Sequence, residues 1–380
     1  MRVLLLADRS FTHREHAMLR RLEIGLFDEG LRVCRTLPEG CKSESDQGLV
    51  GEIRYRDSGL PIFTPHPSRT ILRDIRSFDG LRDSKGVASI DILHAWGEET
   101  WSIAFELSRQ TGAELVLEVW SDAAHRRIPS LERRTRELHA VGAGGIWLAP
   151  DRAMLSMVDR YATRWPVQCS NWGVHVQSLP PRSFEQSHPC TISILATGGT
   201  SSTCVTCLTG LKRSLEEHPQ TSVFLNAECI EANPGIWKQI RALGLLERVS
   251  LVSEMEAQRM LIVQTDILIL PESNGEHRSL ALEAMASGTC LIAASDESVE
   301  CLDSSRAVLV AERTPGAWNA AISRVLGDPA LRMNLGQAAR TYIASSRQSH
   351  MQIESTLGAY RTLLAERPLP FAQSSGSDGT

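Results

Sequence analysis

Short apolar runs alternate with helical patterns along most of the chain. In the first half, the apolar runs typical of buried strands cover residues 3–7, 31–36, 90–95, 114–120 and 145–149. Between them, apolar residues recur at helical spacing and predict helices over 15–29, 101–110, 131–141 and 152–163. Strands and helices that alternate in this way indicate a parallel sheet covered by helices.

The alternation stops at residues 171–189, where three prolines lie among Ser and Gln, and this stretch is the predicted linker. The pattern then resumes. Strands are predicted at 191–197, 222–226, 249–252, 267–270 and 308–310, and helices at 206–217, 234–243, 257–264, 315–326, 329–345 and 352–365. The segment 273–295 supplies one further helix, which Ser279 caps or starts, and one further strand. The chain therefore contains two α/β units in tandem.

We predict an α/β fold of two doubly wound, Rossmann-like domains that face a cleft. The first domain spans 1–182 and is joined by the C-terminal helix at about 350–366. The second domain spans 187–346, and the tail at 368–380 is predicted to be disordered. The polar region 41–85 is predicted to form irregular surface loops. Ligands of such sheets bind outside the C-terminal ends of the strands, so we expect the site in the cleft between the domains.

Composition narrows the function classes. The 380 residues are 42% hydrophobic and 22% charged, with a formal net charge of −5, which argues against a nucleic-acid partner. The nine cysteines are scattered and odd in number, and no secretory leader precedes them, so we expect reduced thiols and a cytoplasmic protein. The first apolar run ends at Asp8, and it is too short for the hydrophobic region of a signal peptide or for a membrane-spanning helix. Any membrane association would therefore be peripheral.

The segment around residues 267–295 carries the clearest chemistry. A strand ends at Pro271, a polar loop follows, and Ser279 begins a helix. The free amides and the dipole at a helix N-terminus can hold a phosphate. Glu283 lies four residues after Ser279, on the same helix face, where its carboxylate could reach ligand hydroxyls. The alternative is that an acidic residue near the helix start interacts only with the helix dipole.

The sequence PESNGEHRSLALEAMASGTCLIAAS resembles the nucleotide-sugar segment of family 4 glycosyltransferases, which have the GT-B fold. LEAMASG at 282–288 carries most of the resemblance. DILHAWG at 91–97, NWGVHV at 171–176, LGLLERVSLV at 243–252 and the C-terminal helices agree with the family in order. The resemblance covers most of residues 1–365.

The resemblance implies a set of site residues. Glu283 would hold the nucleotide ribose, and Glu276 would contact the donor sugar. The segment before the helix and its first turn would hold the diphosphate through Gly275, His277, Arg278, Ser279 and Leu280. No metal or other cofactor is expected, because the GT-B fold does not itself require one.

The chain also departs from the family pattern. Gly275 stands where the first Glu of the pair is expected, one position before Glu276. No Arg or Lys lies between 194 and 207, where the family neutralises the leaving diphosphate. Gly198 and Gly199 offer backbone amides there, and Arg278 is a candidate for the missing charge. Arg9, His13 and Arg14, near the end of the first strand, could also replace the missing basic residues. The alternative interpretation is that these three are solvated surface charges.

Other candidates carry weaker signals. His94 ends a predicted strand on the cleft side, as a catalytic group or as a structural polar cap. Trp120 stands where the family often has a His near the sugar. The CVTC at 204–207 lacks a second ligand pair, so no metal site is predicted.

The predicted function is transfer of a sugar, with retention, from a nucleotide-diphosphate sugar to an acceptor hydroxyl. The acceptor is a glycan, a lipid or a small molecule. Two alternatives stay open. One is a catalytically degenerate GT-B protein that binds a nucleotide sugar or a partner without turnover, favoured by the departures above. The other is a sugar-nucleotide epimerase of related fold.

Overall fold

The computed structural model describes residues 1–41, 50–57, 66–77, 81, 89–140, 144–162, 164–176, 189–199, 201–253, 255–272 and 274–365. Most of the predicted linker and the whole predicted tail at 368–380 lie outside these residues. The predictions made for those two segments therefore stay predictions.

The first sheet has seven strands, all paired in parallel. Their spatial order is β3-β2-β1-β4-β5-β6-β7. The strands are β1 (Arg2–Ala7), β2 (Arg32–Pro38), β3 (Gly51–Tyr55), β4 (Ile92–Trp96), β5 (Glu114–Glu118), β6 (Gly145–Ala149) and β7 (Val167–Cys169). The strand order reverses between β1 and β4, and a doubly wound sheet opens a crevice at that point.

The second sheet repeats this topology with six parallel strands. The order is β10-β9-β8-β11-β12-β13, so the reversal lies between β8 and β11. The strands are β8 (Thr191–Ile194), β9 (Ser222–Asn226), β10 (Val249–Val252), β11 (Ile267–Leu270), β12 (Cys290–Ala294) and β13 (Ala307–Val310).

Helices cover both faces of the first sheet. One face packs against α1 and α13, and the other against α2, α3, α4 and α5. The bounds are α1 (Arg9–Asp28), α2 (Pro67–Ser77), α3 (Glu98–Thr111), α4 (Asp122–Ala140), α5 (Arg152–Asp159) and α13 (Ser349–Ala365). Alternate residues of β1 point to the two faces, so Leu5 packs with α1 while Leu4 packs with α3.

The second sheet is covered in the same way. Helices α6, α8 and α11 pack against one face of this sheet, and α9, α10 and α12 pack against the other face. The bounds are α6 (Ser201–Glu217), α7 (Glu228–Ala232), α8 (Gly235–Ala242), α9 (Met255–Gln264), α10 (Arg278–Ala286), α11 (Pro315–Gly327) and α12 (Pro329–Ser346). Apolar residues of α10 join the same core cluster as α1, so the two domains share buried contacts.

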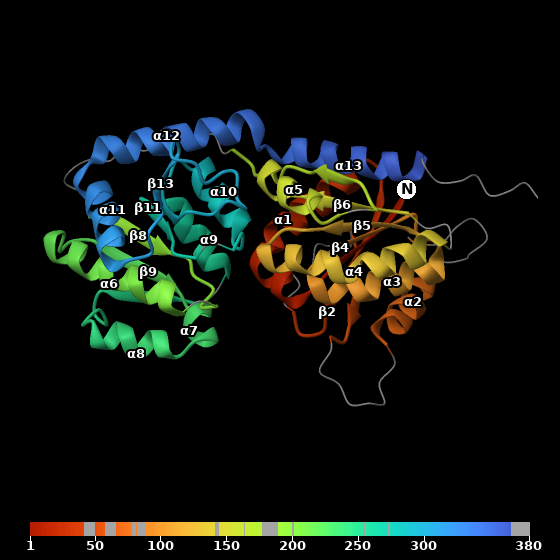
Figure 1. The fold of residues 1–380 in the computed structure, drawn as a ribbon, viewed down its shortest axis with the longest axis horizontal. Helices are drawn as coiled ribbons and strands as arrows, with labels where there is room; N and C mark the ends of the chain where they lie inside the picture. Colours follow the sequence, from red (N-terminus) through yellow and green to blue (C-terminus); the bar gives the residue numbers. More distant parts are fainter. Residues whose placement is uncertain are drawn as a thin grey trace, which may run out of the picture.

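The C-terminal helices connect the two units. Figure 1 shows α12 along the second domain and α13 continuing across the first. Helix α13 packs on α1, β5 and β6, and Tyr360 is completely buried there. The predicted α/β class with two tandem doubly wound sheets is therefore confirmed, and the last helix returns to the first sheet.

Several local expectations differ from the structure. Strand β7 and helix α7 have no predicted counterpart, and α4 begins at Asp122 rather than near residue 131. The region 41–85, predicted to be irregular, contains β3 and α2, whose short apolar signals are Ile53, Tyr55, Ile71 and Ile75. Helix α1 begins at Arg9 rather than near residue 15, because the Asp8 carboxylate accepts a hydrogen bond from the Phe11 N–H at 2.8 Å. That N-cap holds a polar first turn helical, although its apolar spacing is weak.

All nine cysteines are free thiols, and both members of the CVTC segment are buried. No helix in the described part of the chain combines the length and the hydrophobicity needed to cross a membrane.

Candidate active-site cleft

A cavity of about 1390 Å³ lies between the two domains. The first domain lines it with the N-terminal half of α1, the start of α3 and a face of α4 that extends to Arg134. These helices follow the C-terminal ends of β1, β4 and β5. The second domain lines it with α7, α9 and the loop after β11. The cavity thus lies where both sheets present the C-terminal ends of their strands, as predicted for a doubly wound fold.

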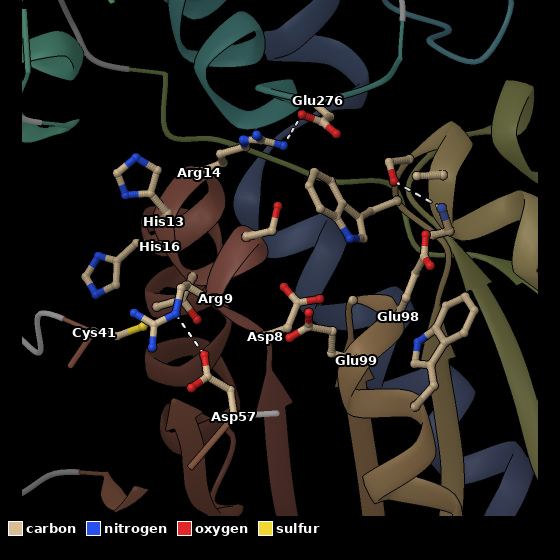
Figure 2. Close-up of a pocket in the computed structure, with 18 of the residues that line it drawn as sticks. Asp8, Arg9, His13, Arg14, His16, Cys41, Asp57, Glu98, Glu99 and Glu276 are labelled. Atoms are coloured by element: carbon tan, nitrogen blue, oxygen red, sulfur yellow. Dashed lines mark hydrogen bonds and ion pairs between the residues drawn. The ribbon is translucent and has the colours of Figure 1, made fainter. Parts of the chain in front are cut away.

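Three carboxylates gather on the first-domain side, at the point where the strand order reverses. Asp8 follows β1, and Glu98 and Glu99 follow β4 (Figure 2). Gly97 has a φ of +91°, and a Cβ at that position would lie 1.7 Å from the Asp8 Oδ2. Burial, with smaller contributions from the two glutamates, raises the pKa of Asp8 to about 6. The Asp8 carboxyl therefore binds a proton at a pH nearer to neutral than an ordinary aspartate does.

The polar face of α1 turns a row of basic side chains toward the cavity. Figure 2 shows Arg9, His13, Arg14 and His16 along this face. Arg9 donates from Nε to the Asp57 carboxylate at 2.8 Å, and its side chain is 52% exposed. These residues make the α1 side of the cleft suitable for an anionic or hydroxyl-rich ligand.

Arg14 connects the two domains across the cleft. Its guanidinium pairs with Glu276 in the loop before α10 (Figure 2). It also pairs with Glu228 at the start of α7, at 2.6 Å. Burial raises the pKa of Glu276, and Arg14 opposes that rise. Glu276 therefore faces the cleft, as predicted, but a first-domain arginine already holds it.

Glu283 also lies between two arginines. One carboxylate oxygen is 2.6 Å from Arg21 Nη1 of α1, and the other is 2.7 Å from Arg259 Nε of α9. Arg259 lines the large cavity. Glu283, the residue predicted to bind the ribose, therefore lies at the domain interface, where two arginines compensate its charge.

The N-terminus of α10 is closed by another acidic residue. The N-cap His277 has a φ of +55°, and it is buried. The Ser279 N–H donates to the carboxylate of Glu15 in α1, at 3.4 Å to Oε1 and 3.2 Å to Oε2. Burial raises the pKa of Glu15 to about 7. Leu280, also predicted to bind the diphosphate, has its side chain in the core and offers only backbone.

Arg278 has a different environment from the predicted one. Its guanidinium is buried and pairs with Asp151, the residue that caps α5. It also donates to the backbone carbonyls of Ser298 at 3.1 Å and Trp120 at 3.4 Å. It does not line the large cavity, so in this conformation its charge joins the domains rather than facing the cleft.

The loop after β8 holds the two predicted glycines. Gly198 has a φ of +75° and lies against the Cys229 backbone, where a side chain would overlap. The Gly199 N–H donates to the Thr197 hydroxyl at 3.2 Å, and the Thr197 N–H donates to Glu272 at 2.6 Å. Gly275, with a φ of +70°, donates its N–H to Asp296 at 3.1 Å. A cavity of only about 20 Å³ remains at these strand ends.

His94 lies away from the cleft. It is fully buried within β4, stacked on Trp96 at 3.7 Å between ring centroids. Its ring nitrogens contact the Tyr360 hydroxyl at 2.7 Å and the Glu118 carboxylate at 2.9 Å. Burial lowers the pKa of His94 below its usual value. These contacts match the structural alternative for His94.

The comparisons with known proteins fit this geometry. Residues 235–342 match the family model of glycosyl transferases group 1. A sucrose-phosphate synthase (tll1590) from Thermosynechococcus elongatus superposes with a TM-score of 0.72 at 15% identity, over 96% of this chain and 99% of that chain. The Anabaena protein Alr3699/HepE, in complex with UDP and glucose, gives 0.71 at 12% identity, over 95% and 100%.

The chain has the GT-B glycosyltransferase fold. WaaG, a glycosyltransferase involved in lipopolysaccharide biosynthesis, also superposes, with a TM-score of 0.61 at 13% identity over 96% of this chain and 99% of that chain. A comparison with curated proteins finds no significant match. The resemblance predicted from the sequence is thus confirmed at the level of the GT-B fold, and the group 1 match supports a glycosyltransferase.

This GT-B cleft contains residues that the sequence reasoning missed. Glu15, Arg21 and Arg259 contact the predicted donor segment from α1 and α9, more than 20 residues away in the sequence. From the sequence alone, Asp8 is only the residue at which the first apolar run ends. Its position directly after a buried strand was the available signal. Among the described residues, no group of His, Cys, Asp or Glu is arranged to hold a metal ion.

Proposed function

We propose that the chain is a glycosyltransferase that moves a sugar from a nucleotide-diphosphate sugar to an acceptor hydroxyl, with retention at the anomeric carbon. The observation that carries this proposal is the interdomain cavity lined by strand ends of both sheets, with the group 1 match on its second-domain side. The neighbour solved with UDP and glucose supports a donor of this chemical class. Retention rests on the resemblance to family 4.

In this proposal the second domain binds the donor and the first domain binds the acceptor. On the second-domain side, Glu283 would bind the ribose, and Glu276 would contact the donor sugar. On the first-domain side, Asp8 and the basic face of α1 would bind the acceptor and its hydroxyl. Domain closure around both substrates would exclude water from the site.

The departing diphosphate needs positive charge, because one lost electrostatic contact of this kind costs about 3 kcal/mol of barrier. Arg259 and Arg14 line the cavity beside the two predicted donor carboxylates. We propose that these two arginines neutralise the diphosphate, in place of the basic pair that the loop after β8 lacks. Arg278, which is held by Asp151, would then have a structural role.

A degenerate, non-catalytic GT-B protein is the second candidate. The observation that favours it is the set of interdomain contacts that already engage the donor segment, with Glu15 at Ser279 and Arg21 at Glu283. A nucleotide sugar would have to rearrange these contacts before it could bind as proposed. The epimerase alternative has no such specific observation in its favour.

The cellular setting is part of the proposal. The nine unpaired cysteines support a cytoplasmic location. The acceptor remains open among a glycan, a lipid and a small molecule, and attachment to a membrane would be peripheral.

The test is a panel of UDP-, GDP- and ADP-sugars, with binding measured by calorimetry and turnover by release of the nucleotide diphosphate. Wild type, Glu283→Gln and a control, Glu217→Gln on the exposed surface of α6, are compared. We expect one nucleotide class to bind and turn over, with loss in Glu283→Gln alone. Binding without turnover would favour the degenerate protein, and an epimerised sugar the epimerase. An absence of binding to every member would refute the donor site.

A further inference from the structure

Glu15 fills the position at which a helix N-terminus binds an anion. Its carboxylate is completely buried, and both oxygens lie within 3.4 Å of the Ser279 N–H in the first turn of α10. The first amides of an α-helix have no acceptor within the helix, and they carry the positive end of its dipole. An internal carboxylate therefore satisfies a donor that could equally bind a phosphate oxygen.

Helix α1 departs from helical geometry at this residue. Glu15 has φ −117° and ψ 20°, and the helix is kinked there. Met18 and Leu22 pack into the core on the far side of the kink, and Phe11 does so on the near side. The kink lies between two segments anchored in the core, and it gives Glu15 a backbone conformation that differs from the rest of α1.

The surroundings of Glu15 are those that an anion needs. Arg259 and Arg278 both act on its carboxylate electrostatically, and they favour its ionised form against the effect of burial. The neighbouring residue Arg14 pairs with two carboxylates of the second domain. Positive charge from three arginines thus converges near the first turn of α10.

His277 provides a second and independent sign of a ligand. It is 2% exposed, and neither ring nitrogen has a hydrogen-bond partner in the described part of the chain. Its nearest charged contact is Glu228 at 3.7 Å, beyond hydrogen-bond distance. His277 is one of the residues that line the small cavity, together with Gly275 and Thr197. A buried polar ring without a hydrogen-bond partner lowers the stability of the fold, unless a ligand supplies the missing hydrogen bond.

We propose that Glu15 is a displaceable plug in an anion site at the N-terminus of α10, which receives the diphosphate of a nucleotide once Glu15 withdraws. This inference rests on the proposed function for the identity of the ligand. Glu15 belongs to the first domain and α10 to the second, so the plug inserts when the cleft closes empty. A bound diphosphate and an inserted Glu15 exclude each other, and the empty closed form is self-inhibited.

The plug predicts that removing the Glu15 carboxylate increases affinity for anions. We would compare wild type with Glu15→Gln and Glu15→Ala. The matched control is Glu29→Gln, which makes the same charge change at the exposed end of α1. Calorimetric titrations with pyrophosphate, UDP, GDP and ADP at pH 8 would give the dissociation constants. Circular dichroism and thermal melts would show that each variant is folded.

We expect both Glu15 variants to bind pyrophosphate, and the nucleotide that the wild type prefers, about tenfold or more tightly than the wild type does. The Glu29 control should match the wild type. If the wild type binds a nucleotide and both Glu15 variants bind it with the same or lower affinity, the plug is overturned and Glu15 is a fixed cap. The proposed function would stay intact. Tighter pyrophosphate binding without binding of any nucleotide would keep the plug and refute the proposed function. No binding of any ligand to any form would overturn both.

Discussion

Arg259 of α9 donates from Nε to the Glu283 carboxylate at 2.7 Å, while Arg21 of α1 holds the other oxygen at 2.6 Å. One partner comes from the same domain as Glu283 and the other from the opposite domain. Glu283 is therefore oriented by its own domain through Arg259 and attached to the first domain through Arg21. Only Arg259 lines the cavity, so the two arginines can be separated by experiment.

Arg259→Gln should weaken nucleotide binding about tenfold, because it removes a cleft-lining charge beside the proposed ribose ligand. The free energy of unfolding should fall by only about 1 kcal/mol, since Glu283 keeps Arg21. Calorimetry and urea denaturation would measure the two effects. The control is Arg324→Gln on the exposed surface of α11, far from the cleft. A loss of stability with unchanged affinity would show that Arg259 serves only the fold.

Arg278→Ala should destabilise the protein by about 3–5 kcal/mol, because it leaves the Asp151 carboxylate buried without its charge partner. The double variant Arg278→Met/Asp151→Asn removes both charges and keeps a residue able to cap α5. We expect it to recover most of the stability in urea denaturation. If Arg278 instead contacted the diphosphate, the double variant would be stable but would bind nucleotides more weakly than wild type.

Glu15 should make stability depend on pH in a defined direction. Its folded-state pKa of about 7 lies above its ordinary value of 4.5, so the folded chain binds the proton more tightly than the unfolded chain. Its favourable contribution is complete below pH 4.5 and is lost as the pH rises through 7. Arg259 and Arg278 face the carboxylate and oppose this loss.

Glu15→Gln should therefore gain stability relative to wild type between pH 5 and pH 8, on the order of 2–3 kcal/mol. Urea denaturation across this range would measure the difference, with Glu29→Gln as the exposed control. A difference that stays constant with pH would mean that Glu15 is ionised throughout.

His94→Phe should lower the free energy of unfolding by about 2–3 kcal/mol, since it removes the partner of the Tyr360 hydroxyl and one partner of the Glu118 carboxylate. The Glu118 carboxylate keeps the hydrogen bond from Trp172 Nε1. Nucleotide affinity should stay within about twofold of wild type, because His94 is fully buried and does not line the cavity. His350→Phe on the exposed side of α13 controls for the substitution itself. Loss of turnover with normal stability would restore the catalytic interpretation of His94.

Gly97→Ala should destabilise the protein much more than Gly30→Ala does. Both glycines have positive φ, at +91° and +81°. A Cβ at 97 would overlap the Asp8 carboxylate, whereas a Cβ at 30 meets nothing within 4 Å. We expect a loss of about 1 kcal/mol for Gly30→Ala from backbone strain alone, and of at least about 3 kcal/mol for Gly97→Ala. Similar thermal melts for the two variants would contradict the close packing at Asp8.

The fold could be predicted because its signals are local. Most buried strands are short apolar runs between helical patterns, and this alternation indicates the α/β class with parallel sheets. Strand β3 and helix α2 are not predicted because each has few apolar residues and the flanking sequence is polar. These residues are Ile53 and Tyr55 in β3, and Ile71, Leu72 and Ile75 in α2. The predicted starts of α1 and α4 lie too late in the sequence, because the first turns of both helices carry few large apolar residues, with Phe11 the one in α1.

The site could be predicted only where one segment carried it. Glu276 and Glu283 were found because loop, helix and carboxylates follow one another in the sequence. The partners of these residues were not found, because the contact between Glu15 and Ser279 joins positions 264 residues apart. Arg278 shows the same limit. Its charge was visible in the sequence, but the buried Asp151 that turns it away from the cleft was not.

The return of α13 to the first sheet has a consequence for dividing the protein. The Thr356 hydroxyl hydrogen-bonds the Ser170 hydroxyl at 2.8 Å, and Gln352 accepts from the Gly173 N–H at 3.0 Å. The Tyr360 hydroxyl contacts the His94 ring of β4 at 2.7 Å. The first domain is thus assembled from two separate pieces of the chain. Proteolysis between the domains would not release it intact, and a free-standing version must fuse residues 349–365 to residues 1–176. The chain's last helix makes the order of synthesis matter: the first domain cannot complete its core until the second has been made.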